Sequence, residues 1–179
     1  MGDHTTSVET PPVGDHVRYL QLALSLAERS PPKPTNFRVG AVLVDEPNNK
    51  ILATGYTLEM PGNTHAEQCC LLKFAIAQAV PEETVADVLP KGTVIYTTME
   101  PCGKRLSGNM PCIDRILATR KGANGGIQKV YVGVQEPEKF VGSNNGKSRL
   151  EEAGIEYIHV HSMEEQILKI ATTGHERTQ

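Results

Sequence analysis

The sequence predicts an α/β domain of three layers, in which helices cover both faces of a five-stranded mixed sheet. Two observations lead to this prediction. Two short apolar runs near the start are spaced as a hairpin, and after them strand-like and helix-like segments alternate along the chain. The chain has 179 residues, of which 39% are hydrophobic and 22% charged, and this composition is typical of one globular domain with its own core.

The first helix is predicted to begin near Asp15. Residues 1–13, which are rich in Thr, Pro and Gly, are predicted to form a flexible tail, so the domain is expected to span residues 14–179. Apolar residues then recur at helical spacing until three prolines end the pattern. These residues are Val17, Leu20, Leu24 and Ala27, followed by Pro31, Pro32 and Pro34.

The hairpin and a second helix are predicted to follow. Residues 39–44 and 51–57 are apolar runs on either side of the turn-forming segment 45–49. The next helix is predicted over residues 65–80, with Asn63 or Thr64 as its N-cap. The histidine at position 65 would then lie at a helix N-terminus, where aligned backbone N–H groups favour anions.

The second half of the chain is predicted to continue the alternation. A strand over residues 93–99 ends directly before Glu100-Pro101-Cys102, and Pro111 starts a helix over residues 111–121 that the glycine-rich segment 122–126 ends. The remaining predicted elements are strands at residues 130–134 and 155–160, and helices at residues 147–153 and 163–172.

Charge and composition argue against several classes of function. A net charge of −3 and a pI near 6.1 give no electrostatic footprint for nucleic acid or for an anionic membrane. No apolar run approaches the roughly 18 residues needed to cross a bilayer, and the polar start of the chain does not resemble a secretory signal. We therefore expect a cytoplasmic protein whose four cysteines are reduced.

Three metal-ligating residues and one carboxylate stand out. The chain contains His65-Ala66-Glu67, then Pro101-Cys102, then Pro111-Cys112. One imidazole and two thiolates suit Zn²⁺ and leave its fourth tetrahedral position open, which distinguishes a catalytic site from a closed structural one. Zinc makes water acidic, and Glu67 can then carry the proton to a leaving group. The pattern therefore predicts hydrolytic chemistry with Zn²⁺ as the cofactor.

A histidine and a glutamate in His-x-Glu, followed by Pro-Cys-x-x-Cys, form the signature of zinc-dependent nucleobase deaminases. Here nine residues, 103–111, separate Cys102 from Cys112, where the general pattern has two. Two alternatives stay open. The histidine and the cysteines could be ordinary packing residues, as most free cysteines are. Cys69, four residues after His65 and so on the same helix face, could also pair with it as a metal ligand.

Four segments carry a resemblance to a known family, namely 36–42 (NFRVGAV), 65–67 (HAE), 98–102 (TMEPC) and 130–155, which includes Glu136-Pro137 and Glu152-Ala153-Gly154-Ile155. They resemble the pyrimidine deaminase of riboflavin biosynthesis, in the form found in fungi. The likeness covers about Asp15 to Val160 and includes the long loop between the cysteines, where residues 105–109 are most similar to the fungal enzymes. The resemblance implies a cytidine-deaminase-like fold and, by analogy, a homodimer or homotetramer.

The resemblance also implies roles for individual residues. It assigns His65, Cys102 and Cys112 to zinc, Glu67 to proton transfer, and Asn36 and Ala66 to substrate contacts. Phe37 departs from the proline that usually follows the asparagine, and Thr57 or Leu58 stands in the region where bacterial relatives carry a histidine, so no role for that histidine is transferred. Asn36 could instead be a turn residue after Pro34-Thr35.

The loop between the cysteines is expected to recognise the substrate. Lys104 and Arg105 lie close to the expected site mouth and could bind a phosphate, so their removal should raise the Michaelis constant more than it lowers turnover. Ser107 and Asn109 could contact ribityl hydroxyls on the same reasoning. The alternative is that the two cations are a solvated surface pair.

The implied reaction is the deamination of a small pyrimidine phosphate, 2,5-diamino-6-ribitylamino-4(3H)-pyrimidinone 5'-phosphate. Bacterial relatives fuse this domain to a reductase, whereas this chain ends at Gln179, so we expect a separate reductase to act first and the ribitylamino compound to be preferred. The alternatives are a cytidine, deoxycytidylate or transfer-RNA adenosine deaminase, and a noncatalytic partner protein stabilised by zinc. Glu67 argues against the last, because a structural zinc site needs no proton carrier.

Overall fold

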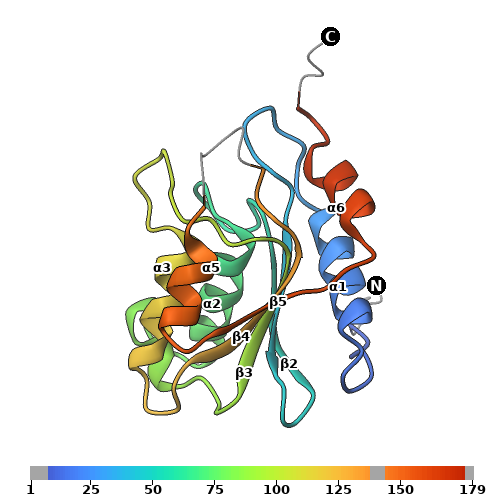
Figure 1. Cartoon of the computed structure of the whole chain (residues 1–179). Coiled ribbons are helices and arrows are strands. Elements are labelled where there is room, and N and C mark those ends of the chain that lie inside the picture. Colours follow the sequence, from blue (N-terminus) through green and yellow to red (C-terminus); the bar gives the residue numbers. More distant parts are fainter. Residues whose placement is uncertain (1–7, 138–143, 176–179) are drawn as a thin grey trace, which may run out of the picture.

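Helices cover both faces of a central sheet in the computed structural model, which describes residues 8–137 and 144–175 (Figure 1). The sheet has five strands, as predicted, and each begins and ends within three residues of its expected position. The strands are β1 (Gly40–Asp45), β2 (Lys50–Tyr56), β3 (Thr93–Met99), β4 (Ile127–Val134) and β5 (Glu156–His159).

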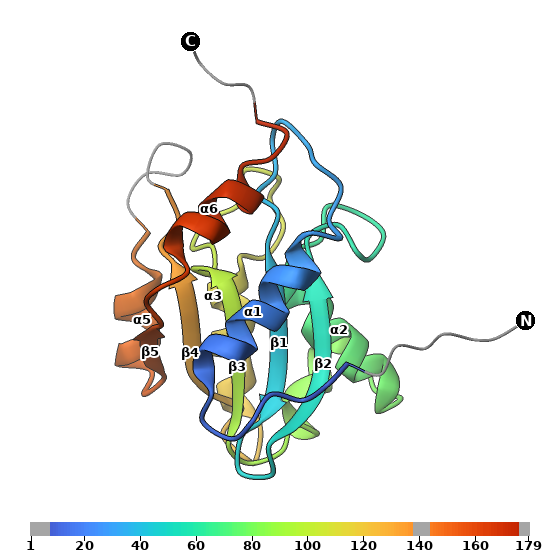
Figure 2. The ribbon, with the colours of Figure 1, turned by 90° about the vertical axis from the view of Figure 1, so that its right-hand side faces the viewer.

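The sheet is mixed, which confirms the predicted fold class. The strand order is β2-β1-β3-β4-β5 (Figure 2). The hairpin partner β2 and the central strand β3 both pair antiparallel with β1, whereas β3 with β4 and β4 with β5 pair parallel. Neighbouring parallel strands bring their carboxyl ends to the same edge, and in open α/β sheets that edge is where ligands bind.

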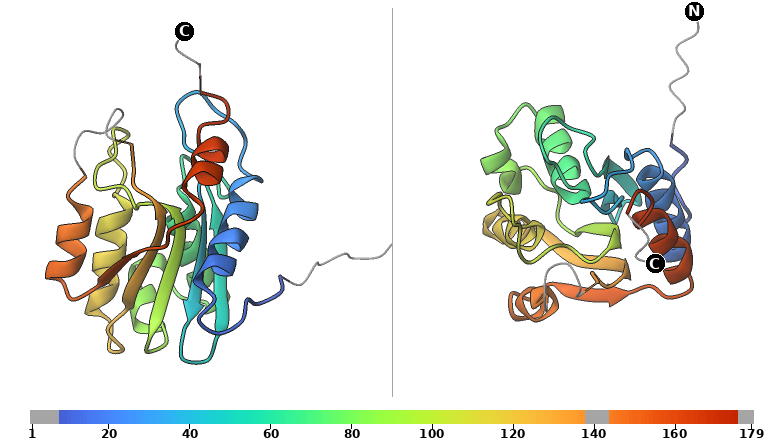
Figure 3. Two further views of the ribbon diagram at one scale, coloured as in Figure 1. Left: turned by 45° about the vertical axis from the view of Figure 1, so that its right-hand side comes forward. Right: turned by 90° about the horizontal axis from the view of Figure 1, so that it is seen from above.

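Two helices lie on one face of the sheet and three on the other, with an apolar core on each side (Figures 1 and 3). The first pair is α1 (His16–Ala27) and α6 (Glu164–Ala171), and the second set is α2 (Ala66–Ala77), α3 (Cys112–Ala118) and α5 (Gly146–Glu152). Short 3-10 turns at Glu82–Asp87, which the sequence did not predict, and at Thr119–Lys121 complete the second layer. In the described part of the chain, no helix has the length and apolar character needed to cross a membrane.

Close packing of α1 on the sheet explains which face of that helix is buried. A Cβ atom at Gly40 of β1 would lie only 1.8 Å from the carbonyl oxygen of Ala23, so this crossing requires glycine. The buried residues of α1 are Tyr19, Leu20, Ala23, Leu26 and Ala27. The expected stripe was therefore partly wrong, since Val17 is exposed and Leu24 only half-buried.

Tertiary contacts alter the expected structure in two places, at the N-cap of α2 and in the N-terminal tail. The N-cap of α2 is His65 itself, in an extended conformation, and not Asn63 or Thr64. The hydroxyl of Thr64 donates instead to the carbonyl of Met60 at 2.9 Å. Within the predicted tail, Pro11 is buried and its carbonyl accepts a hydrogen bond from the side chain of Asn49 at 3.0 Å. Residues 1–7 of that tail lie outside the described residues, and the predicted domain boundary stays a prediction.

Candidate metal centre and active-site cavity

The three predicted metal ligands come together from three different elements. His65 is the N-cap of α2, Cys102 follows the end of β3, and Cys112 is the first residue of α3. The backbone N–H of Cys112 donates to the Sγ of Cys102 at 3.3 Å, which holds the two ends of the long loop together. The extra length of that loop therefore does not separate the cysteines, because both ends are fixed by regular elements.

The spacing of the donor atoms fits a zinc ion. Nδ1 of His65 lies 3.5 Å from the Sγ of Cys102 and 3.5 Å from the Sγ of Cys112. Zinc bonds of about 2.3 Å to sulfur and about 2.0 Å to nitrogen at tetrahedral angles place those atoms about 3.5 Å apart. Cys69, the alternative ligand, is buried elsewhere on α2 and does not belong to the cluster. Burial raises the pKa of its thiol, as expected of a packing residue.

The thiols of Cys102 and Cys112 differ in pKa, and therefore in how readily each forms the thiolate that binds a metal. A hydrogen bond from Cys112, followed by the imidazole of His65, lowers the pKa of Cys102 to about 4. The same hydrogen bond and burial raise the pKa of Cys112 well above its ordinary value. Cys102 is thus a ready thiolate, whereas Cys112 releases its proton when a metal binds.

Glu67 lies beside the ligands without joining them. The residue is 3% exposed. Oε1 lies 3.0 Å from the hydroxyl of Thr97, and Oε2 accepts from the Sγ of Cys112 at 3.4 Å. Burial, followed by the charge of Cys102, raises the pKa of Glu67. A buried carboxyl that binds a proton more readily than usual, at the edge of a metal position, can carry protons in a reaction.

A cavity of about 400 Å³ opens above these residues. Four of the six predicted substrate contacts line it, namely Asn36, Lys104, Arg105 and Ser107. Ala66 does not line it, because its methyl group packs in the core beneath α2, so a contact through its main chain stays a prediction. Asn109 is exposed and also lies outside the cavity wall, and its backbone N–H donates to the hydroxyl of Ser107 at 3.4 Å. The loop thus turns Ser107, and not Asn109, toward the cavity.

Arg105 lines the cavity and is also anchored within the protein, and its expected contact with the substrate stays a prediction. It is 9% exposed, so it is not part of a solvated surface pair. One guanidinium nitrogen donates to Oε1 of Gln68 at 3.2 Å, and the other donates to the carbonyl of Asn63. The same Oε1 accepts the backbone N–H of His65 at 3.4 Å. Arg105 therefore ties the loop between the cysteines to the start of α2, whereas its neighbour Lys104 stays exposed at the cavity wall.

Asn36 belongs to the same network. Its amide nitrogen donates to Oδ1 of Asn63 at 3.0 Å, and its amide oxygen accepts from the hydroxyl of Thr35 at 3.1 Å. Because Asn63 also accepts from Arg105, a chain of hydrogen bonds runs from the loop between the cysteines to Asn36. The asparagine is therefore held at the cavity wall by the fold, and not only by a local turn.

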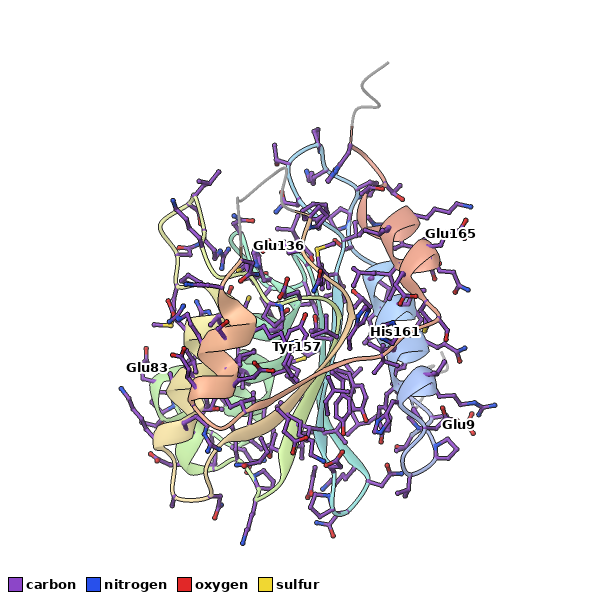
Figure 4. The ribbon with its side chains drawn as sticks, in the orientation of Figure 1. Glu9, Glu83, Glu136, Tyr157, His161 and Glu165 are labelled. Atoms are coloured by element: carbon purple, nitrogen blue, oxygen red, sulfur yellow. The ribbon has the colours of Figure 1, made fainter. Side chains whose placement is uncertain are left out.

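Sequence reasoning missed Glu136, which lines the cavity (Figure 4). Burial, followed by the charge of Cys102, raises the pKa of Glu136 to about 7. The side chain of Asn144 donates to its Oε2 at 3.0 Å, and Glu100 accepts its backbone N–H at 3.1 Å. A signal existed: Glu136 follows β4, which is parallel to β3, so both carboxyl ends lie at one edge. His175, also in the wall, had no such signal.

Comparison with known proteins places residues 14–133 within the family model described as the cytidine and deoxycytidylate deaminase zinc-binding region. A curated relative, the diaminohydroxyphosphoribosylamino-pyrimidine deaminase of Schizosaccharomyces pombe, is 37% identical over 161 residues, which are 90% of this chain and 36% of that protein. The chain thus spans about a third of the length of the curated relatives it matches.

Solved structures are similar as well, and two of them show the range of the likeness. The Aspergillus oryzae Rib2 deaminase in complex with DARIPP, a C-terminal deletion mutant, is 52% identical, with a TM-score of 0.83, 90% of this chain covered and 92% of that one. A deaminase/reductase of Thermotoga maritima, named for a diaminohydroxyphosphoribosylaminopyrimidine and a 5-amino-6-(5-phosphoribosylamino)uracil, is 26% identical, with a TM-score of 0.65. That match covers 87% of this chain and 39% of the other.

Proposed function

Because the chain belongs to the zinc-binding cytidine and deoxycytidylate deaminase family, we propose that it is the pyrimidine deaminase of a riboflavin pathway. The reaction is hydrolysis of 2,5-diamino-6-ribitylamino-4(3H)-pyrimidinone 5'-phosphate to 5-amino-6-ribitylaminouracil 5'-phosphate and ammonia. The observation that carries the proposal is the set of His65, Cys102 and Cys112 at zinc spacing, with Glu67 beside it at the floor of one cavity.

The chemistry requires one proton carrier, and Glu67 meets the requirement. His65, Cys102 and Cys112 would hold a zinc ion, which would supply a Lewis acid that lets water lose a proton near neutral pH. The Glu67 carboxylate takes that proton as the water oxygen bonds to C2 of the ring, and passes it to the adjacent ring nitrogen. Glu67 then delivers the second water proton to the amino group, the C2–N bond breaks, and ammonia leaves. The hydroxyl of Thr97 lies 3.0 Å from one carboxyl oxygen and helps to orient it.

Substrate recognition is proposed for residues around the cavity mouth. Lys104 is exposed at the wall and offers a cation for the phosphate. Ser107 and Glu136 offer a hydroxyl and a carboxyl for the ribityl chain, and the Asn144 contact fixes one Glu136 oxygen. Asn36 lies on the same wall, at the position where the resemblance places a substrate contact. A cytoplasmic location and self-association as a homodimer or homotetramer are further parts of this proposal.

The preference for a ribitylamino over a ribosylamino substrate is the sharpest part of the proposal. The S. pombe relative is named for a phosphoribosylamino compound, whereas the A. oryzae relative was crystallised with DARIPP. The test is ammonia release from the ribitylamino phosphate, the ribosylamino phosphate, cytidine and deoxycytidylate, measured side by side. We expect efficiency to fall in the order ribitylamino, ribosylamino, cytidine. Equal efficiency on the first two would refute the preference, and turnover of cytidine compounds alone would refute the pathway.

A further inference from the structure

We propose that His159, His161 and Glu164 form a second binding site for a transition-metal ion, where β5 ends and α6 begins. One ligand atom from each of the three residues lies within 4.8 Å of the others. The end of β5 supplies His159, and the first residue of α6 supplies Glu164. His161, which Figure 4 labels, lies between them in the chain. None of the three lines the catalytic cavity. The site is therefore separate from the proposed catalytic zinc and does not depend on the proposed function.

A single carboxylate oxygen organises the site. Oε1 of Glu164 lies 3.4 Å from Nε2 of His159 and 3.1 Å from Nδ1 of His161. The two imidazole rings are 4.1 Å apart between centroids. Two imidazoles that converge on one carboxylate are the donor set of a metal site, and an ion among them would replace these direct contacts with stronger bonds to the metal.

The ring of His159 is held beside Glu164 by the neighbouring strand. Its Nε2 lies 2.9 Å from the carbonyl of Gly133, so the nitrogen that faces Glu164 would exchange this hydrogen bond for a bond to the metal and release its proton when an ion binds. The side chain of His161 is 75% exposed, which leaves one side of the site open for metal entry and for water ligands.

The turn between the two histidines and the carboxylate is held in an unfavourable conformation. Ser162 has a φ of +94°, which non-glycine residues rarely adopt. Its backbone N–H donates to Oε2 of Glu164 at 2.9 Å, so this oxygen is fixed while Oε1 faces the imidazoles. A glutamate in the first turn stabilises a helix even when it binds no metal. This helix-capping role explains the contact of Glu164 with Ser162, but it does not explain why both imidazoles converge on Oε1.

The donor set selects the class of ion. Two imidazoles and one carboxylate, with no thiolate, suit Zn²⁺, Ni²⁺, Co²⁺ or Cu²⁺, and they do not suit Ca²⁺ or Mg²⁺, which prefer all-oxygen sites. Three protein ligands leave the remaining positions to water. Because the exposed site lacks thiolates and has open positions, we expect it to exchange metal more readily than the buried cysteine site.

Metal at this site would fasten a segment that reaches the catalytic cavity. Ile167 of α6 packs so closely on β4 that a Cβ at Gly133 would lie 2.3 Å from its Cδ1. The chain after α6 then brings His175 to the cavity wall, where its Nε2 lies 2.9 Å from the carbonyl of Asn36. An ion that joins β5 to the start of α6 therefore stabilises the helix that carries this part of the wall.

The test counts zinc ions and measures their affinity. Protein that already holds one zinc per chain is titrated calorimetrically with Zn²⁺, as wild type and as the variants His161→Asn and Glu164→Gln. Glu165→Gln is the matched control, because it removes the neighbouring exposed carboxylate of the same helix (Figure 4). We expect one further zinc in wild type and control, and binding at least about tenfold weaker in both variants, since even outer-shell changes cost about 10- to 100-fold.

A second measurement shows that the variants are folded. Excess Zn²⁺ should raise the thermal midpoint of wild type and Glu165→Gln, because the ion binds the folded state, and should raise those of His161→Asn and Glu164→Gln clearly less. Before the excess zinc is added, the midpoints of all four proteins, each with one zinc per chain, should agree within a few degrees. Either of two results would overturn the proposal: no second zinc in wild type, or equal second-site affinity in all four proteins.

Discussion

The two neighbouring cations of the loop between the cysteines should behave differently when each is replaced by alanine. Arg105 makes two charge-assisted hydrogen bonds from a site that is 9% exposed, to Gln68 and to Asn63. Such bonds contribute about 1.5–3 kcal/mol each, so even at the lower end Arg105→Ala loses about 3 kcal/mol that anchors the loop. A loss of that size makes the ratio of ordered to disordered loop about a hundredfold smaller. Lys104 is exposed and anchors nothing in the described structure, so its loss should leave the loop in place.

The assay that separates the two roles compares the phosphorylated substrate with the same compound after removal of its phosphate. Lys104→Ala should raise KM on the phosphorylated substrate, leave kcat nearly unchanged, and have no effect on the dephosphorylated one. Arg105→Ala should lower kcat/KM by about a hundredfold on both, and should also lower the thermal midpoint. Arg105→Lys should recover little, because a lysine lacks the planar fork that reaches both acceptors.

The reasoning fails if the effect of Arg105→Ala disappears on the dephosphorylated substrate while thermal stability is unchanged. Arg105 would then contact the phosphate directly, as the sequence suggested, and its contacts with α2 would be incidental. An effect of Lys104→Ala that persists without the phosphate would contradict the other half of the argument.

Three further predictions concern the metal, the proton carrier and the assembly. Cys102→Ser and Cys112→Ser should lose the catalytic zinc in metal analysis, whereas Cys69→Ser should retain it, and the opposite pattern would disprove the ligand assignment. Glu67→Gln should keep zinc and stability but lose turnover by about a hundredfold or more, because removal of a general acid-base typically has that effect, and steady-state rates near wild type would exclude the role. Light scattering should show a dimer or tetramer, and a mass of 19.5 kDa at micromolar concentration would contradict self-association.

Much of this protein could be inferred from its sequence because the relevant signals are local. The five strands lie within a few residues of their predicted positions, since alternating runs and turn residues specify them directly. The candidate zinc site was also predictable as a cluster. His65 and Cys112 begin helices and Cys102 follows a strand, so the regular elements carry all three to one place whatever the length of the loop between the cysteines.

Only the tertiary structure decided how the cavity wall is built. Neither the direction of the Arg105 guanidinium nor the engagement of Asn36 can be derived from spacing, because both depend on Asn63, which is distant in sequence from each. The same holds for His175, which reaches the wall only because α6 packs on β4. Periodicity and motifs indicate the secondary structure that a segment forms from its own residues. A side chain in an irregular loop takes its direction from whichever donors and acceptors the rest of the fold places beside it, and those are not encoded near it in the chain.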